Sequence, residues 1–158
     1  MSVLEWERTP YTISTNSARL DLDAIHAFLA HESYWAAGIA SDLLARGIRH
    51  SLCFGVYHAS AQIGFARVIS DYATYAYLND VYILAPYRGQ GLATWLIECV
   101  LAHPDLQDLR RFMLTTKDAQ EFYGRFGFIP LVFPVRHMER LDADFLQQMR
   151  AGASLEHP

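Results

Sequence analysis

Hydrophobic and polar positions follow a strand period in the middle of the chain. Residues 51–57 and 62–70 alternate between apolar and other side chains with a period of two, and residues 75–84 form a long aromatic and β-branched run. Segments typical of turns, at 58–61 and 71–74, separate these stretches. The pattern therefore predicts an antiparallel meander of strands.

The residues before the meander show a short strand pattern and then helical spacing. Residues 11–14 predict a strand. Either Asp21 or Asp23 is a suitable N-cap for the apolar residues that follow at helical spacing, so a helix is predicted there. Residues 35–45 predict a second helix, which should end near Gly47 because glycine commonly follows the last turn of a helix.

The residues after the meander predict a helix, a strand and another helix. Apolar residues in 91–102 recur at the spacing of an amphipathic helix, and 111–115 is a short strand. Because a crossover helix joins strands that run in the same direction, 75–84 and 111–115 should be parallel. A further helix is expected from an N-cap at Asp118 to a closing glycine at Gly127.

The last part of the chain predicts two closing strands, at 128–133 and 135–138, and a weak helix at 142–150. Together the elements predict an α/β fold: a mixed, mostly antiparallel sheet of six or seven strands with helices on both faces. Residues 1–153 are expected to form a single domain. Residues 154–158 show no structural pattern and are expected to be a disordered tail or residues left from cloning.

The composition is that of a packed globular protein. Of the 158 residues, 52% are hydrophobic and 19% are charged, and the formal net charge is −4. A mildly acidic chain is a poor candidate for nucleic-acid binding, and the sequence contains no apolar run long enough to predict a membrane span. Cys53 and Cys99 lie in apolar runs and are interpreted as buried thiols of a reducing compartment, so a cytoplasmic location is expected. No His/Cys cluster suggests a metal.

Two polar residues, Asn79 and Asp80, interrupt the otherwise apolar third strand of the meander. An extra or polar residue inside a strand commonly marks a bulge, and bulges often stand next to functional sites. The pair therefore predicts a bulge or a functional group at this point.

The turn between the third strand and its helix has the features of an anion site. It reads Arg-Gly-Gln-Gly-Leu-Ala-Thr over residues 88–94. The first turn of a helix has backbone N–H groups without internal partners, and Gly89 and Gly91 would let a ligand approach them closely. Arg88 could add charge-assisted bonds and Thr94 a hydroxyl group. A pyrophosphate would fit such a site.

The spacing of the glycines in the turn helps to decide between other interpretations. An ordinary strand-to-helix turn with two glycines remains open, because the glycines alone are weak evidence. A dinucleotide site is disfavoured, since Thr94 occupies the third glycine position of that pattern. A P-loop is excluded because no Gly-Lys-Ser/Thr sequence follows.

Two motifs resemble one enzyme family. The pattern Arg88-x-x-Gly91-x-Ala93 resembles the acyl-coenzyme A signature Q/R-x-x-G-x-G/A of the GNAT acetyltransferases, and the segment from Tyr123 to Phe128 is similar to the family's Y-x-x-x-G-F. The resemblance implies a GNAT-like sheet that splays at its central parallel pair, and acetyl-CoA as cosubstrate without a metal. A homodimer is common in the family.

The resemblance also implies which residues bind the coenzyme. The backbone of the third meander strand would pair with the pantetheine arm and the thioester carbonyl, while the glycine turn would bind the pyrophosphate. Many members place asparagine near Asp118, where this sequence departs from the pattern and the aspartate is first of all a predicted N-cap. The implied set is Val81, Tyr82, Ile83, Arg88, Gly89, Gln90, Gly91, Leu92, Ala93, Thr94 and Asp118.

Two residues are candidates for proton transfer. Tyr123 would protonate the leaving thiolate, and the alternative is a helix tyrosine that only packs against neighbouring aromatic residues. Asp80 would take a proton from the attacking amine, directly or through water, and the alternative is an aspartate that merely stabilises the bulge.

The acceptor side of the site is expected to be aromatic. Tyr34, Trp35 and Tyr82 are candidate substrate contacts, with Asp71 as a weaker candidate that could simply be a turn residue. The leading hypothesis is transfer of an acetyl group from acetyl-CoA to a small-molecule primary amine by direct attack. A non-catalytic acyl-CoA sensor, or an enzyme that acetylates protein lysines or N-termini, is the alternative.

Overall fold

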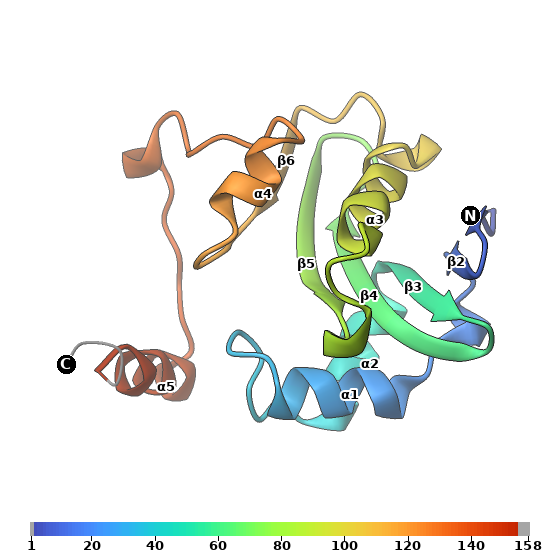
Figure 1. Cartoon of the computed structure of the whole chain (residues 1–158). Coiled ribbons are helices and arrows are strands. Elements are labelled where there is room, and N and C mark those ends of the chain that lie inside the picture. The colour runs from blue at the N-terminus through green and yellow to red at the C-terminus, as the bar shows by residue number, and fades with distance from the viewer. Residues whose placement is uncertain (1, 155–158) are drawn as a thin grey trace. The chain divides into compact units, whose positions relative to one another are not determined.

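The computed structural model describes residues 2–154, which form two compact units within 1–119 and 120–158 (Figure 1). The strands are β1 (Glu5–Arg8), β2 (Tyr11–Ser14), β3 (Leu52–His58), β4 (Ala61–Ser70), β5 (Tyr75–Ile83) and β6 (Arg111–Leu114). The helices are α1 (Leu22–His31), α2 (Ser41–Arg49), α3 (Leu92–Leu101), α4 (Gln120–Gly124) and α5 (Ala143–Ser154). Single 3-10 turns are formed by Ser17–Arg19, Ala85–Tyr87, Pro104–Leu106 and Pro134–Arg136.

The sheet of the first unit has six strands in the order of the sequence, β1 to β6. Neighbouring strands are antiparallel except β5 and β6, which are parallel. The predicted meander and parallel crossover are therefore confirmed, as is the mixed and mostly antiparallel sheet. Strand β1 was not predicted, because its sequence Glu-Trp-Glu-Arg has little of the apolar character that marks a strand.

Helices cover both faces of this sheet. The rings of Phe28 in α1 and Tyr82 in β5 stack with centroids 3.8 Å apart, and both residues are buried, so α1 packs on this face. The core there also contains side chains of α1, α2 and the facing positions of β3 and β4: Ile25, Leu29, Leu44, Ile48, Cys53 and Phe65. Neighbouring side chains of a strand point to opposite faces. Phe54, next to Cys53, therefore faces away from this core and contacts His103, two residues after the end of α3.

The second predicted helix was placed too early. Residues 35–40 form an irregular loop, and α2 begins at Ser41. Gly38 adopts φ +73° and its N–H donates to the carbonyl of Ala30, a geometry incompatible with a continuous helix from 35. The loop brings Trp35 back towards the sheet.

The two closing strands predicted at 128–133 and 135–138 are wrong. Within residues 2–154, no strand follows β6, and Pro134–Arg136 form a 3-10 turn instead. Proline has no N–H for a strand ladder, so Pro130 and Pro134 break the alternation that suggested strands.

The second unit holds α4 and α5. Gly127 has φ +87°, and the N–H of Phe128 donates to the carbonyl of Tyr123, which closes the turn after α4 as predicted. The terminal helix is confirmed and extends to Ser154, while residues 155–158 of the expected tail lie outside the described residues.

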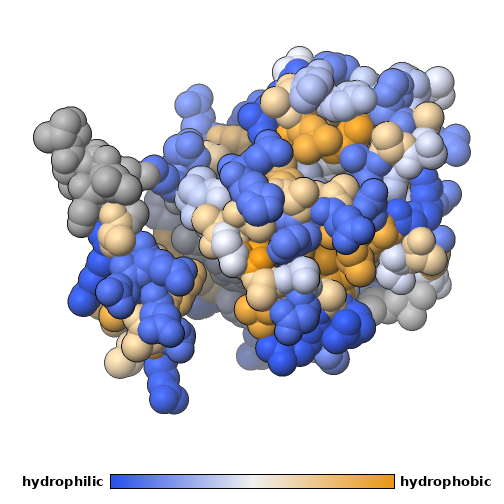
Figure 2. Space-filling view, turned by 90° about the horizontal axis from the view of Figure 1, so that it is seen from below, coloured by the Kyte–Doolittle hydropathy of each residue, from blue (hydrophilic) through white to orange (hydrophobic). Residues whose placement is uncertain are grey.

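Figure 2 shows the molecule from the side on which Figure 1 draws α1 and α2. Hydrophilic and hydrophobic residues are mixed on this face. Leu22 of α1 and Leu43 of α2 are exposed apolar residues. Singly exposed apolar side chains are normal for globular proteins. Among residues 2–154, no helix has both the length and the hydropathy needed to cross a membrane.

Candidate active site

Strand β5 carries the predicted bulge at the polar pair. Arg67 of β4 pairs with Asn79 and Phe65 pairs with Tyr82, so two residues of β5 stand opposite one residue of β4. Asp80 is one of them and adopts φ +54°, which is uncommon for a residue with a side chain. The bulge is thus confirmed, and it redirects the backbone in the middle of the sheet.

The same strand has an unpaired edge beyond the bulge. Strand β6 pairs only with Tyr75–Leu78, and within the described residues no strand pairs with that edge of β5 from 79 to 83. Backbone N–H and C=O groups on such an edge can bind an extended ligand in the manner of an added strand. This is the predicted splay of the parallel pair. Val81, Tyr82 and Ile83 all lie along it.

The glycine turn follows directly at the end of this edge. Gly89 and Gly91 have φ +74° and +77°, and a Cβ atom at either position would meet no atom of the described chain within 4 Å outside its neighbours. Gly91 caps α3 without a side-chain hydrogen bond, and among the described residues the first turn of α3 contains no acidic side chain. The first N–H groups of α3 are therefore open to an anion, and the cradle fits a pyrophosphate.

Two side chains of the turn are fixed by hydrogen bonds to other parts of the first unit. Arg88 Nε donates to the carbonyl of Ile83 at 2.8 Å, and the hydroxyl of Tyr11 donates to Gln90 Oε1 at 2.7 Å. Leu92 is buried, so only its backbone can face a ligand. Ala93 and Thr94 are half-buried in the first turn of α3. The turn is thus tied both to β5 and to the distant strand β2.

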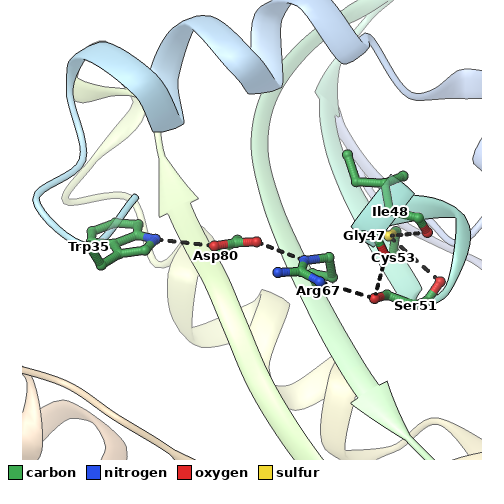
Figure 3. A network of polar contacts seen from close by, with 7 residues as sticks. All are labelled: Trp35, Gly47, Ile48, Ser51, Cys53, Arg67 and Asp80. Atoms are coloured by element: carbon green, nitrogen blue, oxygen red, sulfur yellow. Dashed lines mark hydrogen bonds and ion pairs between the residues drawn. The ribbon is translucent and has the colours of Figure 1, made fainter. Parts of the chain in front are cut away.

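Asp80 belongs to a buried polar network, drawn in Figure 3. Arg67 Nε donates to Asp80 Oδ2 at 2.7 Å, and Trp35 Nε1 donates to Asp80 Oδ1 at 3.2 Å. The carboxylate side chain is only 4% exposed and that of Arg67 12%. The structure thus brings the candidate base and a candidate substrate contact together. Arg67 was missed from the sequence, although a charge at the period of Phe65 and Ile69 was a usable signal.

The loop between α1 and α2 lies beside the splayed strands. Tyr34 accepts a hydrogen bond from the N–H of Lys117, just beyond β6, at 3.1 Å, while Trp35 reaches Asp80 in β5. The rings of Tyr34 and Trp35 meet edge to face at 5.1 Å. Burial raises the pKa of the Tyr82 hydroxyl, which favours its neutral form. Of the three predicted aromatic residues, Trp35 thus contacts the bulge of β5, Tyr34 contacts the segment after β6, and Tyr82 is a buried residue of β5 itself that packs against α1.

Asp71 lies at the opposite end of β5 from the glycine turn. Its Oδ1 accepts the N–H groups of Ala73, Thr74 and Tyr75, and its Oδ2 accepts the Thr74 hydroxyl at 2.7 Å. These bonds hold the pKa of the Asp71 carboxyl well below its ordinary value. The structure shows a loop-forming aspartate, and contact with a substrate stays a prediction.

Asp118 and Tyr123 lie near the division between the two units. Helix α4 begins at Gln120, so Asp118 is not directly before it, and Thr116 Oγ1 accepts the N–H of Ala119. Tyr123 belongs to α4 in the second unit, where its ring meets Phe122 at 5.0 Å and Phe128 at 6.0 Å. Its predicted packing is therefore present, and its acid role stays a prediction.

A surface pocket of about 250 Å³ lies between α1 and α2, and its lining includes Leu22, His26 and Ala45 but none of the predicted site residues. In the part of the chain that the structure describes, no group of His, Cys, Asp and Glu side chains is arranged to hold a metal ion.

Comparison with known proteins adds independent information. The sequence model of the acetyltransferase (GNAT) domain matches residues 49–130. A candidate acetyltransferase of Gibberella zeae is 34% identical over 142 residues, which cover 76% of this chain and 79% of that protein.

Solved structures of acetyltransferases are also similar to this chain. The crystal structure of a candidate GNAT acetyltransferase from Xanthomonas campestris pv. campestris is 49% identical with a TM-score of 0.82, over 84% of this chain and 93% of that one. A candidate acetyltransferase from Deinococcus radiodurans, 19% identical, shares the fold with a TM-score of 0.67 over 92% and 97% of the two chains.

Proposed function

The chain belongs to the GNAT family of acetyltransferases, and we propose that it moves the acetyl group of acetyl-CoA to a primary amine of a small molecule. The observation that carries the proposal is the unpaired edge of β5 from residue 79 to 83, which leads into the open glycine turn at the start of α3. An extended arm that ends in a pyrophosphate matches these two features in order.

The backbone would do most of the coenzyme binding. The edge at Val81–Ile83 would pair with the amide groups of the pantetheine arm, and a backbone N–H there would stabilise negative charge on the thioester oxygen. The first N–H groups of α3 would bind the pyrophosphate, with Gly89 and Gly91 leaving room for it. The Arg88 guanidinium has further N–H donors besides the one bonded to Ile83.

The chemical step would be direct attack. The amine nitrogen forms a bond to the thioester carbon, and the carbon–sulfur bond breaks. We assign Tyr123 to protonate the leaving sulfur and Asp80 to accept the proton lost by the amine through a water molecule. The Asp80 carboxylate has about four acceptor sites, of which Arg67 and Trp35 occupy two, so it retains capacity for that water.

The region around Trp35 supports a small acceptor. Trp35 is half-buried, and its indole is fixed to Asp80 while Tyr34 reaches the segment beyond β6. Aromatic side chains there favour an acceptor with apolar or cationic character. The two buried, free cysteines, Cys53 and Cys99, support a reducing compartment such as the cytoplasm.

The test is amine-dependent release of free thiol from acetyl-CoA by the purified protein. A panel of small aliphatic and aromatic amines is compared with short peptides that carry a lysine or a free N-terminus. Turnover with free amines and not with peptides supports the proposal, and the reverse preference would establish a protein acetyltransferase. Tight binding of acetyl-CoA without thiol release across the whole panel would make the chain an acyl-CoA sensor.

A further inference from the structure

We infer that Arg67 is a positioning residue for acetyl transfer, acting through Asp80 on both the bulge of β5 and the indole of Trp35. The catalytic consequence rests on the proposed function, whereas the structural coupling does not. Figure 3 shows the chain of contacts from Trp35 through Asp80 and Arg67 to the end of α2.

Arg67 is held from two directions. Its Nε donates to Asp80 Oδ2 at 2.7 Å, and its Nη1 donates to Ser51 Oγ at 3.2 Å. Ser51 Oγ in turn donates to the carbonyl of Gly47 at 2.8 Å, near the end of α2. A Cβ atom at Gly47 would lie 3.2 Å from Arg67 Nη1, so this glycine leaves the guanidinium its space. The fork of an arginine can serve two acceptors at once, which a lysine ammonium on a flexible stem does less well.

Asp80 needs such support because its own conformation is unfavourable. A non-glycine residue at φ +54° persists only where its surroundings hold it. Its carboxylate is almost completely buried, and burial of a charge requires a partner charge and hydrogen bonds. Arg67 supplies the charge and one bond, and Trp35 supplies the other bond.

Loss of Arg67 would therefore disturb two parts of the site together. Without this cation, the buried Asp80 carboxylate loses its partner charge, so it should move towards solvent and its bond with Trp35 should change. Asp80 also lies on the unpaired edge of β5, directly before Val81, so a shift of the bulge displaces the neighbouring backbone N–H that would face the thioester oxygen. Small displacements of positioned groups lower turnover strongly.

The experiment compares Arg67→Met, Asp80→Asn and the double variant. Arg67→Met should lower kcat by about 10- to 100-fold while the KM for acetyl-CoA changes by less than about threefold, because the glycine turn is untouched. In the Asp80→Asn background, Arg67→Met should change kcat by less than about threefold, since the group it acts through is already neutral. Arg19→Met is the control, because it removes an ion pair of the same unit, with Glu5, away from this network.

A second measurement does not depend on turnover. The indole N–H resonance of Trp35, assigned with Trp35→Phe, should shift in Arg67→Met and stay in place in Arg19→Met. Unchanged kcat in Arg67→Met, or effects of Arg67→Met and Asp80→Asn that multiply, would overturn the inference. If the unsubstituted protein releases no thiol, the proposed function fails, and an unshifted Trp35 resonance alone then refutes the positioning role. If Arg67→Met does not fold, kcat of Asp80→Asn is compared with kcat of the double variant. A difference of less than about threefold supports the inference, and a larger loss in the double variant overturns it.

Discussion

Replacement of Gly91 by valine separates the coenzyme site from the stability of the fold. Gly91 has φ +77°, and a Cβ atom there would meet no atom of the described chain within 4 Å outside its neighbours. The substitution therefore adds backbone strain but no clash within the protein. An anion seated on the first N–H groups of α3 would meet the new side chain instead.

The two effects differ in magnitude. A left-handed conformation is disfavoured for residues with a side chain by roughly 1–2 kcal/mol. In a chain of this size each kcal/mol lowers Tm by about 2–4 °C, so a fall of roughly 2–8 °C is expected. Loss of two charge-assisted hydrogen bonds to the pyrophosphate removes about 3 kcal/mol or more, which weakens coenzyme A binding by at least about 100-fold.

The assay is calorimetric titration with coenzyme A, alongside thermal unfolding. Gly38→Val is the matched control, because Gly38 has φ +73° and equally open surroundings but lies in the loop between α1 and α2. Both variants should lose a similar few degrees of Tm, and only Gly91→Val should lose coenzyme A affinity. A normal titration of Gly91→Val would refute the phosphate assignment, and equal loss of affinity in both variants would attribute the effect to general strain.

Two further changes test other groups. Tyr123→Phe should lower turnover by about 10- to 1000-fold with little change in acetyl-CoA affinity, and thiol release at saturating acetyl-CoA measures this; unchanged turnover would remove Tyr123 as the acid. Burial lowers the pKa of His103, so the folded state disfavours the charged ring, and the stability it contributes is present above about pH 6.5 and is lost as pH falls. His103→Asn keeps an acceptor for the N–H of Asp105, and its Tm should therefore fall less than that of the unsubstituted protein between about pH 8 and about pH 5.5; an equal fall would exclude His103 as the titrating group.

Much of the sheet could be predicted because its signals are local. The strand pattern in 51–57 and 62–70 correctly predicts β3 and β4, each of which pairs with a neighbouring strand on both sides. The parallel arrangement of β5 and β6 followed from a single crossover rule. The same alternation misled at 128–138, where prolines remove the N–H groups that a strand ladder needs.

Within the candidate site, the glycine turn has a local sequence signal, whereas the Asp80 network has none. The turn is built from consecutive residues whose backbone angles depend on glycine, so its conformation could be predicted from its own sequence, while its role in binding a phosphate stays a prediction.

The network instead joins Asp80 to Arg67 and Trp35, which lie 13 and 45 positions away in the sequence. A hydrophobic period in the sequence describes contacts within one helix or strand, so it cannot place Trp35, in an irregular loop, against a bulge in β5. The helix predicted from residue 35 also gave no reason to expect that contact. Trp35 could be selected only as an aromatic residue of the first helical region, and Arg67 only as a charge on an apolar face. Both become part of the site because one buried carboxylate needs two donors, a requirement that is visible only once the sheet is formed.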